Sequence, residues 1–172
     1  MKNEIIFQGL TQKSNLEYLK RVIELPNADL VLLSSAFMNK GGLGLVYDEL
    51  ANCSCTKQVY AGVRNGITSA QGVNAALAAG CEVFTIDTGA SDIIFHPKVY
   101  LSMSDQEVRM LLGSANLTQS GLWRSIVPPP SIFVCFHPLE NSTFASKPNS
   151  LVLYLFMIIP VRHSCQLMAR LG

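Results

Sequence analysis

The sequence predicts an α/β domain in which a mixed β-sheet is flanked by helices on both faces. As far as about residue 124, short apolar segments alternate with segments of helical spacing, which is the pattern of strands joined by crossover helices. Two later apolar segments are separated only by a short polar turn, so they add an antiparallel hairpin to the sheet. With 172 residues, of which 49% are hydrophobic, the chain is long enough to enclose an apolar core.

Local patterns predict the N-terminal elements. A short strand is expected at residues 5–7, and Ser14, with a glutamate three residues later, starts the first helix with a capping box. The apolar run 29–36 (DLVLLSSA) is typical of a strand buried on both faces. Three nearby glycines then predict a loop, followed by helical spacing to residue 52; they are Gly41, Gly42 and Gly44.

The central segments continue the alternation of strands and helices. A strand over 58–63 ends in the turn Arg64-Asn65-Gly66, and a further strand is expected over 81–86. Between them, an alanine-rich helix over 68–79 ends at Gly80, a natural C-cap.

The composition changes beyond about Ser125. Six of the eight prolines lie there, with one of the twelve glycines and one acidic residue, Glu140. We therefore divide the chain into a catalytic domain, 1–124, and an atypical proline-rich, apolar tail, 125–172. Two explanations stay open for this tail: an irregular appendage, or a segment foreign to the ancestral domain, for instance after a reading-frame change.

Charge, cysteines and hydropathy limit the class of protein. A net charge of +1 decides nothing about a nucleic-acid partner, because local phosphate sites do not show in that total. The five cysteines form no CxxC pair, so we expect idle thiols in a reducing cytoplasm. The longest apolar run, 151–160, is too short for a membrane helix, and the N-terminus does not resemble a signal peptide. A soluble cytoplasmic protein with no membrane partner is expected.

The predicted hairpin, with strands over 93–102 and 108–114 joined by a polar turn at 104–106, carries the candidate chemistry. His96 and Lys98 lie two residues apart in its first strand, so their side chains share a face. Two such groups on an apolar strand are costly to bury without an anion. We therefore expect an anion to bind there.

The turn 113–116 (GSAN) after the second strand presents a hydroxyl, an amide and free backbone N–H groups, which suit a phosphate. The hairpin brings this turn beside His96 and Lys98. The neutral imidazole of His96 can attack phosphorus to form a phosphohistidine, while the charge of Lys98 faces the non-bridging oxygens. Ser114 and Asn116 donate hydrogen bonds as charge builds. No carboxylate cluster for magnesium accompanies these residues, so the predicted chemistry needs neither metal nor cofactor.

Three further residues are candidates for substrate binding, because ligands in α/β folds bind beyond the carboxyl ends of strands. Ser35 ends the second strand, Arg64 follows the third, and Gly113 opens the GSAN turn. Each can equally belong to an ordinary turn, and both interpretations stay open.

The segment FHPKVYL followed by GSANLTQSGL resembles the HxK…GSxN signature of the phospholipase D superfamily, and GSANLT is typical of its nuclease branch. The resemblance covers about residues 1–124 and implies a mixed α/β sheet. It also implies that two motifs meet at one active site, with one histidine as nucleophile and the other as general acid. Since this chain has one motif, the resemblance implies a homodimer that cleaves DNA without a metal. Residues 1–124 look like the N-terminal catalytic domain of phospholipase D-type restriction endonucleases.

Two departures from the family pattern leave a second hypothesis open. The family often has an Asp soon after the Lys, and here the nearest is Asp105. Many members also have an acidic residue soon after GSxN, whereas here none precedes Glu140. A histidine without a carboxylate to orient it is a poor nucleophile. The alternative is a noncatalytic remnant that binds DNA or phosphate, and a lipid-cleaving enzyme is a weaker third.

Overall fold

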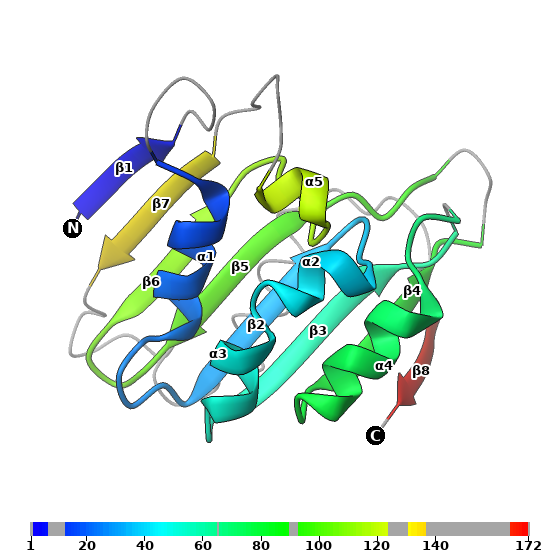
Figure 1. Ribbon diagram of the computed structural model, residues 1–172, viewed down its shortest axis with the longest axis horizontal. Coiled ribbons are helices and arrows are strands. Elements are labelled where there is room, and N and C mark those ends of the chain that lie inside the picture. The colour runs from blue at the N-terminus through cyan, green and yellow to red at the C-terminus, as the bar shows by residue number, and fades with distance from the viewer. Residues whose placement is uncertain are drawn as a thin grey trace.

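The computed structural model of the chain describes residues 2–6, 13–64, 66–89, 93–123, 131–136 and 166–171. These residues form an eight-stranded sheet of order β1-β7-β6-β5-β2-β3-β4-β8 (Figure 1). The strands are β1 (Lys2–Ile6), β2 (Leu30–Ser35), β3 (Thr56–Gly62), β4 (Glu82–Asp87), β5 (Lys98–Met103), β6 (Val108–Leu112), β7 (Ser131–Phe136) and β8 (Gln166–Leu171). The helices of the described residues are α1 (Asn15–Ile23), α2 (Lys40–Gly44), α3 (Tyr47–Asn52), α4 (Ala70–Ala78) and α5 (Gln119–Leu122).

The sheet is mixed, which confirms the predicted class. β2, β3 and β4 are parallel neighbours, whereas β5 is antiparallel to β2 and β6 is antiparallel to β5. The chain passes from β1 to β2, from β2 to β3 and from β3 to β4, and each of these connections moves across the sheet in the same direction (Figure 1). Right-handed crossovers that step in one direction place their helices on one face. The helices of the described part accordingly cover one face of the sheet, so for these residues the prediction of helices on both faces was wrong.

Each face of the sheet carries its own apolar cluster. On the helix-covered face, the cluster contains helical residues such as Leu19 and strand residues such as Leu33 and Tyr100. The other face is lined by residues that include Leu101 and Phe84, with no helical residue in the described cluster. Alternate residues of a strand point to opposite faces, so Lys98 and Tyr100 point toward the helices and Leu101 points away.

Two helix termini match the local predictions. Ser14 caps α1, and its Oγ accepts a hydrogen bond of 3.1 Å from the backbone N–H of Glu17. Gly80 follows α4 with a φ of +77°, the left-handed conformation in which glycine is favoured.

The glycine-rich segment is a short helix, α2, so the prediction of a loop was wrong. Asn39 caps α2 by accepting a hydrogen bond of 2.9 Å from Gly42 N. A Cβ at Gly42 would lie 2.2 Å from the carbonyl oxygen of Leu117. Gly42 is therefore required for close packing of this helix on the GSAN segment, not for a flexible loop.

The predicted hairpin is confirmed, but its first strand begins later than expected. Ser104 N donates to Glu107 O at 2.9 Å in the turn that joins β5 to β6. β5 starts at Lys98 and not at residue 93. Pro97 has no N–H to donate to a neighbouring strand, which accounts for the late start.

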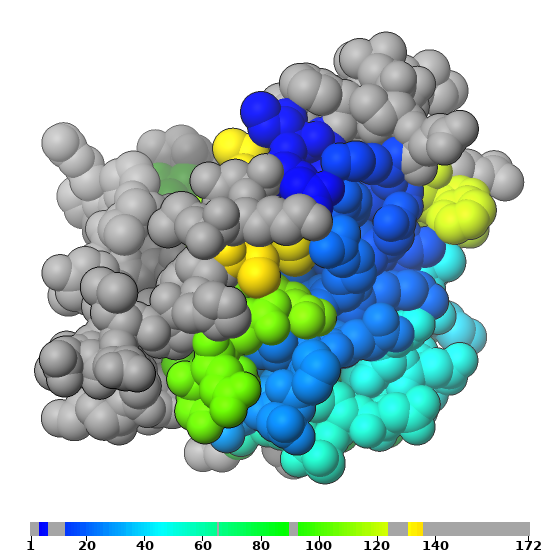
Figure 2. All heavy atoms as spheres, turned by 90° about the vertical axis from the view of Figure 1, so that its left-hand side faces the viewer, coloured from blue at the N-terminus to red at the C-terminus, as the bar shows by residue number. Residues whose placement is uncertain are grey.

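The sheet includes strands on both sides of residue 124. β7 lies between β1 and β6, and the ring of Phe133 packs against Tyr18 of α1 with centroids 5.1 Å apart. Figure 2 views this side, where the yellow atoms of β7 lie beside the blue N-terminal residues. β8 pairs with β4 at the opposite edge. The division into a catalytic domain and a tail stays a prediction.

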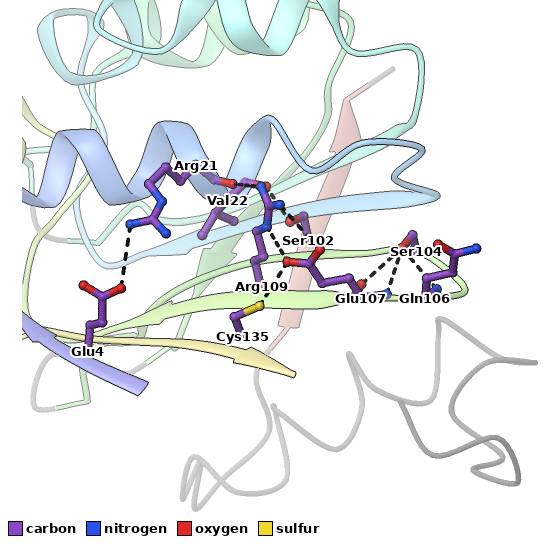
Figure 3. A network of polar contacts seen from close by, with 9 residues as sticks. All are labelled: Glu4, Arg21, Val22, Ser102, Ser104, Gln106, Glu107, Arg109 and Cys135. Carbon is purple, nitrogen blue, oxygen red and sulfur yellow. Dashed lines mark hydrogen bonds and ion pairs between the residues drawn. The ribbon is translucent and has the colours of Figure 1, made fainter. Parts of the chain in front are cut away.

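A polar network fixes the C-terminal end of α1 to the hairpin (Figure 3). Ser102 Oγ donates to the carbonyl of Val22, and Arg109 Nη1 donates to the carbonyl of Arg21 at 2.8 Å. Glu107 holds Arg109 through a contact of 2.7 Å between Oε1 and Nε. The last carbonyls of the helix, which have no partner within it, are thus satisfied by side chains of β5 and β6.

The expectation of free thiols was wrong for one pair. Cys53 and Cys55 form a disulfide, and their Cα atoms lie 5.5 Å apart, within the usual range for such a bond. Cys81 and Cys135 are free. Among the described helices, none has the length and apolar character needed to cross a membrane.

Candidate active site

The motif residues lie at the end of the sheet where the parallel strands β2 and β3 terminate. The register pairs Ser35, the last residue of β2, with Lys98, the first residue of β5. Gly113, which follows β6, donates its backbone N–H to the carbonyl of Lys98 at 3.2 Å. This geometry puts the residues before β5 and after β6 at one end of the sheet, where ligands of α/β folds commonly bind.

Lys98 and His96 are in direct contact. The Nζ atom of Lys98 lies 2.7 Å from Nδ1 and 2.8 Å from Nε2 of His96, and it donates to the carbonyl of His96 at 3.2 Å. Lys98 is only 5% exposed, whereas His96 is exposed to solvent. The ring of Phe37 meets the imidazole edge-on, with centroids 6.1 Å apart. A buried ammonium therefore faces an accessible imidazole.

Burial shifts the protonation of both groups. It lowers the pKa of Lys98 to about 8, since an ammonium is costly to remove from water. Burial, and then the charge of Lys98, lower the pKa of His96 below its ordinary value. The lowered pKa favours the neutral form of the imidazole at pH 7. None of the ion pairs formed by the described residues gives Lys98 an anionic partner.

The GSAN turn contributes two buried polar atoms that have no partner. Within the described part of the chain, neither Ser114 Oγ nor Asn116 Oδ1 makes a hydrogen bond. Buried polar atoms are nearly always hydrogen-bonded, so such atoms indicate a ligand, an ion or a water at the site. A hydroxyl and a side-chain amide, whose O and N assignment can be exchanged, both suit a phosphate oxygen.

The packing around this turn leaves it little freedom. Its continuation pairs with the segment after β2, because Asn39 N donates to Leu117 O at 3.2 Å. A Cβ at Gly121 would lie 2.5 Å from the carbonyl oxygen of Asn116, so α5 packs directly on the turn. The backbone around Asn116 is therefore held from two sides.

The candidate substrate-binding residues lie in different surroundings. The Ser35 hydroxyl is buried, donates to Phe37 O at 2.8 Å and accepts from Leu117 N at 2.9 Å. Arg64 pairs with Asp87 at 2.7 Å on the exposed surface. A Cβ at Gly113 would lie 2.2 Å from Ser131 Oγ, so this glycine permits close packing on β7. Asn65 lies outside the described residues.

Two residues next to the motif were missed from the sequence. Tyr100 is fully enclosed, and its hydroxyl donates to the carbonyl of Ala115 at 2.7 Å. Alternation along the strand already places Tyr100 on the face of Lys98, but its partner after β6 is visible only in the fold. Phe37, which packs on His96, carried no signal in the sequence.

No described carboxylate makes a hydrogen bond to the His96 ring. Asp105 lies in the turn between β5 and β6, at the opposite end of the hairpin from Lys98. Within the described ranges, no three His, Cys, Asp or Glu side chains group as a metal site requires. The metal independence of the reaction stays a prediction.

Comparison with solved structures identifies the fold. NucT from Helicobacter pylori matches with a TM-score of 0.60 and 15% identity, over 91% of this chain and 96% of that chain. Nuc, a phospholipase D family member from Salmonella typhimurium, matches with a TM-score of 0.59 and 12% identity, over 91% and 92%. A polyphosphate kinase from Porphyromonas gingivalis matches at 0.59 and 14%, over 95% of this chain but 27% of that one.

No family model and no curated protein matches the sequence. The structural matches show that the chain has a phospholipase D-type, nuclease-like fold.

Proposed function

We propose that this chain is a metal-independent endonuclease that hydrolyses DNA phosphodiester bonds through a phosphohistidine on His96. The observation that carries the proposal is the buried ammonium of Lys98 against His96, at the same end of the sheet as two unpartnered polar atoms. Among the described residues no carboxylate pairs with Lys98, and a phosphate group would supply the negative charge that its buried ammonium favours. The nuclease-like fold supports a nucleic acid as the source of that phosphate.

The proposed reaction has two steps. A ring nitrogen of neutral His96 attacks phosphorus, the P–O bond to the leaving oxygen breaks, and a general acid protonates that oxygen. Water then attacks the phosphohistidine and gives a proton to the former general acid, the P–N bond breaks, and the imidazole and the acid are both restored. Lys98 offsets the charge on the non-bridging oxygens in both steps, while Ser114 and Asn116 donate to them.

The general acid is assigned to His96 of a second copy of this chain. One copy supplies one motif histidine, while the reaction needs a nucleophile and an acid on opposite sides of phosphorus. A twofold axis brings the same surface of both copies together, so it provides the second histidine and the second lysine. We propose a homodimer for this reason, with sequence-specific cleavage as in restriction endonucleases.

A noncatalytic phosphate-binding protein is the second candidate. It is favoured by the absence, in the described part of the chain, of a carboxylate that orients His96. Such a protein keeps the anion site of Lys98, Ser114 and Asn116, but its imidazole attacks phosphorus poorly.

Cleavage of supercoiled plasmid DNA in excess EDTA separates the two candidates. The endonuclease converts the plasmid to nicked and linear forms with chelator present. A purified chain that binds DNA without cutting it supports the noncatalytic candidate. Cutting that requires added magnesium contradicts the proposed mechanism.

A further inference from the structure

Two buried hydroxyls hold the backbone of the GSAN turn on either side of Asn116. On one side, the Tyr100 hydroxyl donates to the carbonyl of Ala115 at 2.7 Å. On the other side, Ser35 Oγ accepts a hydrogen bond of 2.9 Å from Leu117 N. Tyr100 and Ser35 are each 1% exposed, so both hydrogen bonds are sheltered from competing water.

These hydroxyls come from neighbouring strands that also carry the motif lysine. The register pairs Ser35 with Lys98, and Leu33 with Tyr100, across β2 and β5. Because directly opposed residues share a face, Ser35, Lys98 and Tyr100 all point toward the helix-covered side. The turn is therefore tied to the same two strands that position the ammonium.

Ser35 also connects the turn to the surroundings of His96. Its hydroxyl donates to the carbonyl of Phe37 at 2.8 Å, and the ring of Phe37 packs edge-on against the imidazole. A single hydroxyl thus bridges the GSAN turn and the segment that contacts His96. Burial raises the pKa of the Tyr100 hydroxyl, which keeps it protonated as a donor.

We propose that Ser35 and Tyr100 are positioning residues, which hold Ser114 and Asn116 where charge develops on the phosphate oxygens. The inference rests on the proposed function. It replaces direct substrate contact by Ser35, because the single donor hydrogen of its hydroxyl is used on the carbonyl of Phe37 and is not available to a phosphate oxygen. Donors stabilise a transition state only when they are held in place beforehand, and a displacement of about 1 Å costs on the order of a hundredfold in rate.

The chain offers a matched control for each residue. Ser102 is a buried serine of β5 whose hydroxyl binds the carbonyl of Val22 at the other end of the sheet. Tyr60 is a buried tyrosine on the other face, with its hydroxyl 3.2 Å from Gln58 Oε1. Ser102→Ala and Tyr60→Phe remove similar groups without touching the GSAN turn.

Steady-state cleavage of DNA tests the proposal. Ser35→Ala and Tyr100→Phe are expected to lower kcat by about ten- to a hundredfold with KM within about twofold of wild type, because the donors act mainly in the transition state. Ser102→Ala and Tyr60→Phe are expected to lower the melting temperature and to leave kcat and KM unchanged. Equal kcat losses in all four variants overturn the positioning role. If Ser35→Ala does not fold, Tyr100→Phe decides alone.

Binding of orthovanadate, which adopts the five-coordinate geometry of the displacement, gives a readout without cleavage. Its affinity is expected to fall in Ser35→Ala and Tyr100→Phe by the same factor as kcat, and to stay constant in the controls. A wild-type chain that binds orthovanadate without cleaving DNA defeats the proposed function, while the variant affinities still decide the positioning. Unchanged affinities in both variants, or no binding by wild type, overturn the positioning.

Discussion

The two ends of the sheet differ in whether their buried polar groups have hydrogen-bond partners among the described residues. At the end where β2 and β3 begin, Lys57 Nζ donates at 2.9 Å to each of three backbone carbonyls, those of Leu50, Cys53 and Ala79. At that same end, Ser102 and Arg109 donate to the last carbonyls of α1. At the other end, Lys98 faces His96, and within the described part of the chain it has no anionic partner. There, too, Ser114 Oγ and Asn116 Oδ1 have no hydrogen-bond partner among the described residues.

This difference indicates that Lys57 serves the stability of the fold, whereas Lys98 serves the proposed function. Lys57 completes the hydrogen bonding of two helix ends, so its ammonium stabilises the fold. Lys98 is buried and has no anionic partner among the described residues, so its ammonium is costly to the fold unless an anion binds. Lys57 belongs to a network whose hydrogen bonds are made within the protein, whereas Lys98 belongs to the proposed phosphate site.

The largest effect on activity is expected from a substitution at the end of the sheet that carries His96 and Lys98. His96→Ala should lower DNA cleavage by at least about a thousandfold, since it removes the proposed nucleophile. Because the imidazole is exposed, the melting temperature should change little. Plasmid cleavage and thermal unfolding of the same preparation measure both. A folded His96→Ala variant that cuts as fast as wild type would falsify the assignment.

Replacing each lysine by methionine tests the contrast itself. Lys57→Met should lower the free energy of unfolding by about 2–3 kcal/mol, because charged hydrogen bonds to three carbonyls are lost. Lys98→Met should leave that free energy unchanged or raise it by about 1 kcal/mol, because a buried unpaired charge is removed. Urea unfolding at pH 7 without phosphate measures both values. Equal destabilisation by the two substitutions contradicts the contrast.

The pH dependence of stability sharpens the argument about Lys98. Its pKa is lowered to about 8 in the folded chain, against an ordinary value of 10.5, so its destabilising effect is full below pH 8. That effect should disappear as the pH rises from 8 to 10.5, which raises stability by about 2 kcal/mol or less.

The comparison with Lys98→Met isolates this contribution, because the buried tyrosines, whose pKa values are raised by burial, affect the stability of both proteins equally. The rise from pH 8 to 10.5 should be present in wild type and absent from the variant. Saturating inorganic phosphate should also remove it, since an anion restores the charged form. Parallel curves for wild type and Lys98→Met are incompatible with the proposed environment.

The smallest expected effect is on the activity of mixed dimers, which tests whether a second copy of the chain contributes its His96. If the active site contains His96 from both subunits, an equal mixture of wild type and His96→Ala forms mixed dimers that lack one histidine. Activity per wild-type chain should then fall to about half after subunit exchange. Mass in solution should be that of a dimer. A monomer that retains full activity contradicts the shared site.

The sequence predicts the local elements of this site better than their environment. The spacing of His96 and Lys98, the GSAN turn and the Ser104 hairpin all follow from alternation and turn chemistry over short distances. One wrong prediction, that of a glycine-rich loop, failed because of a contact between distant segments. Gly42 was assigned to a loop because its need to approach Leu117 is invisible before the chain folds.

The supporting residues show the same limit. Ser35 was a candidate for substrate binding because it lies at the end of a strand. Its hydrogen-bond partners, Phe37 and Leu117, come from two different segments. Tyr100 shares a face with Lys98, but its bond to Ala115 depends on the return of β6 beside β5. Side-chain to backbone bonds across strands need the register, which spacing alone does not provide.

Trapping the covalent intermediate tests the central claim most directly. DNA labelled with ³²P at internal phosphates is mixed with wild type and quenched within the first turnover, and the protein is digested and mapped. A label is expected on the peptide that contains His96, bound through an acid-labile, alkali-stable P–N bond, and none is expected on His96→Ala. Active cleavage without any covalent label, or a label on another residue, would contradict the claim.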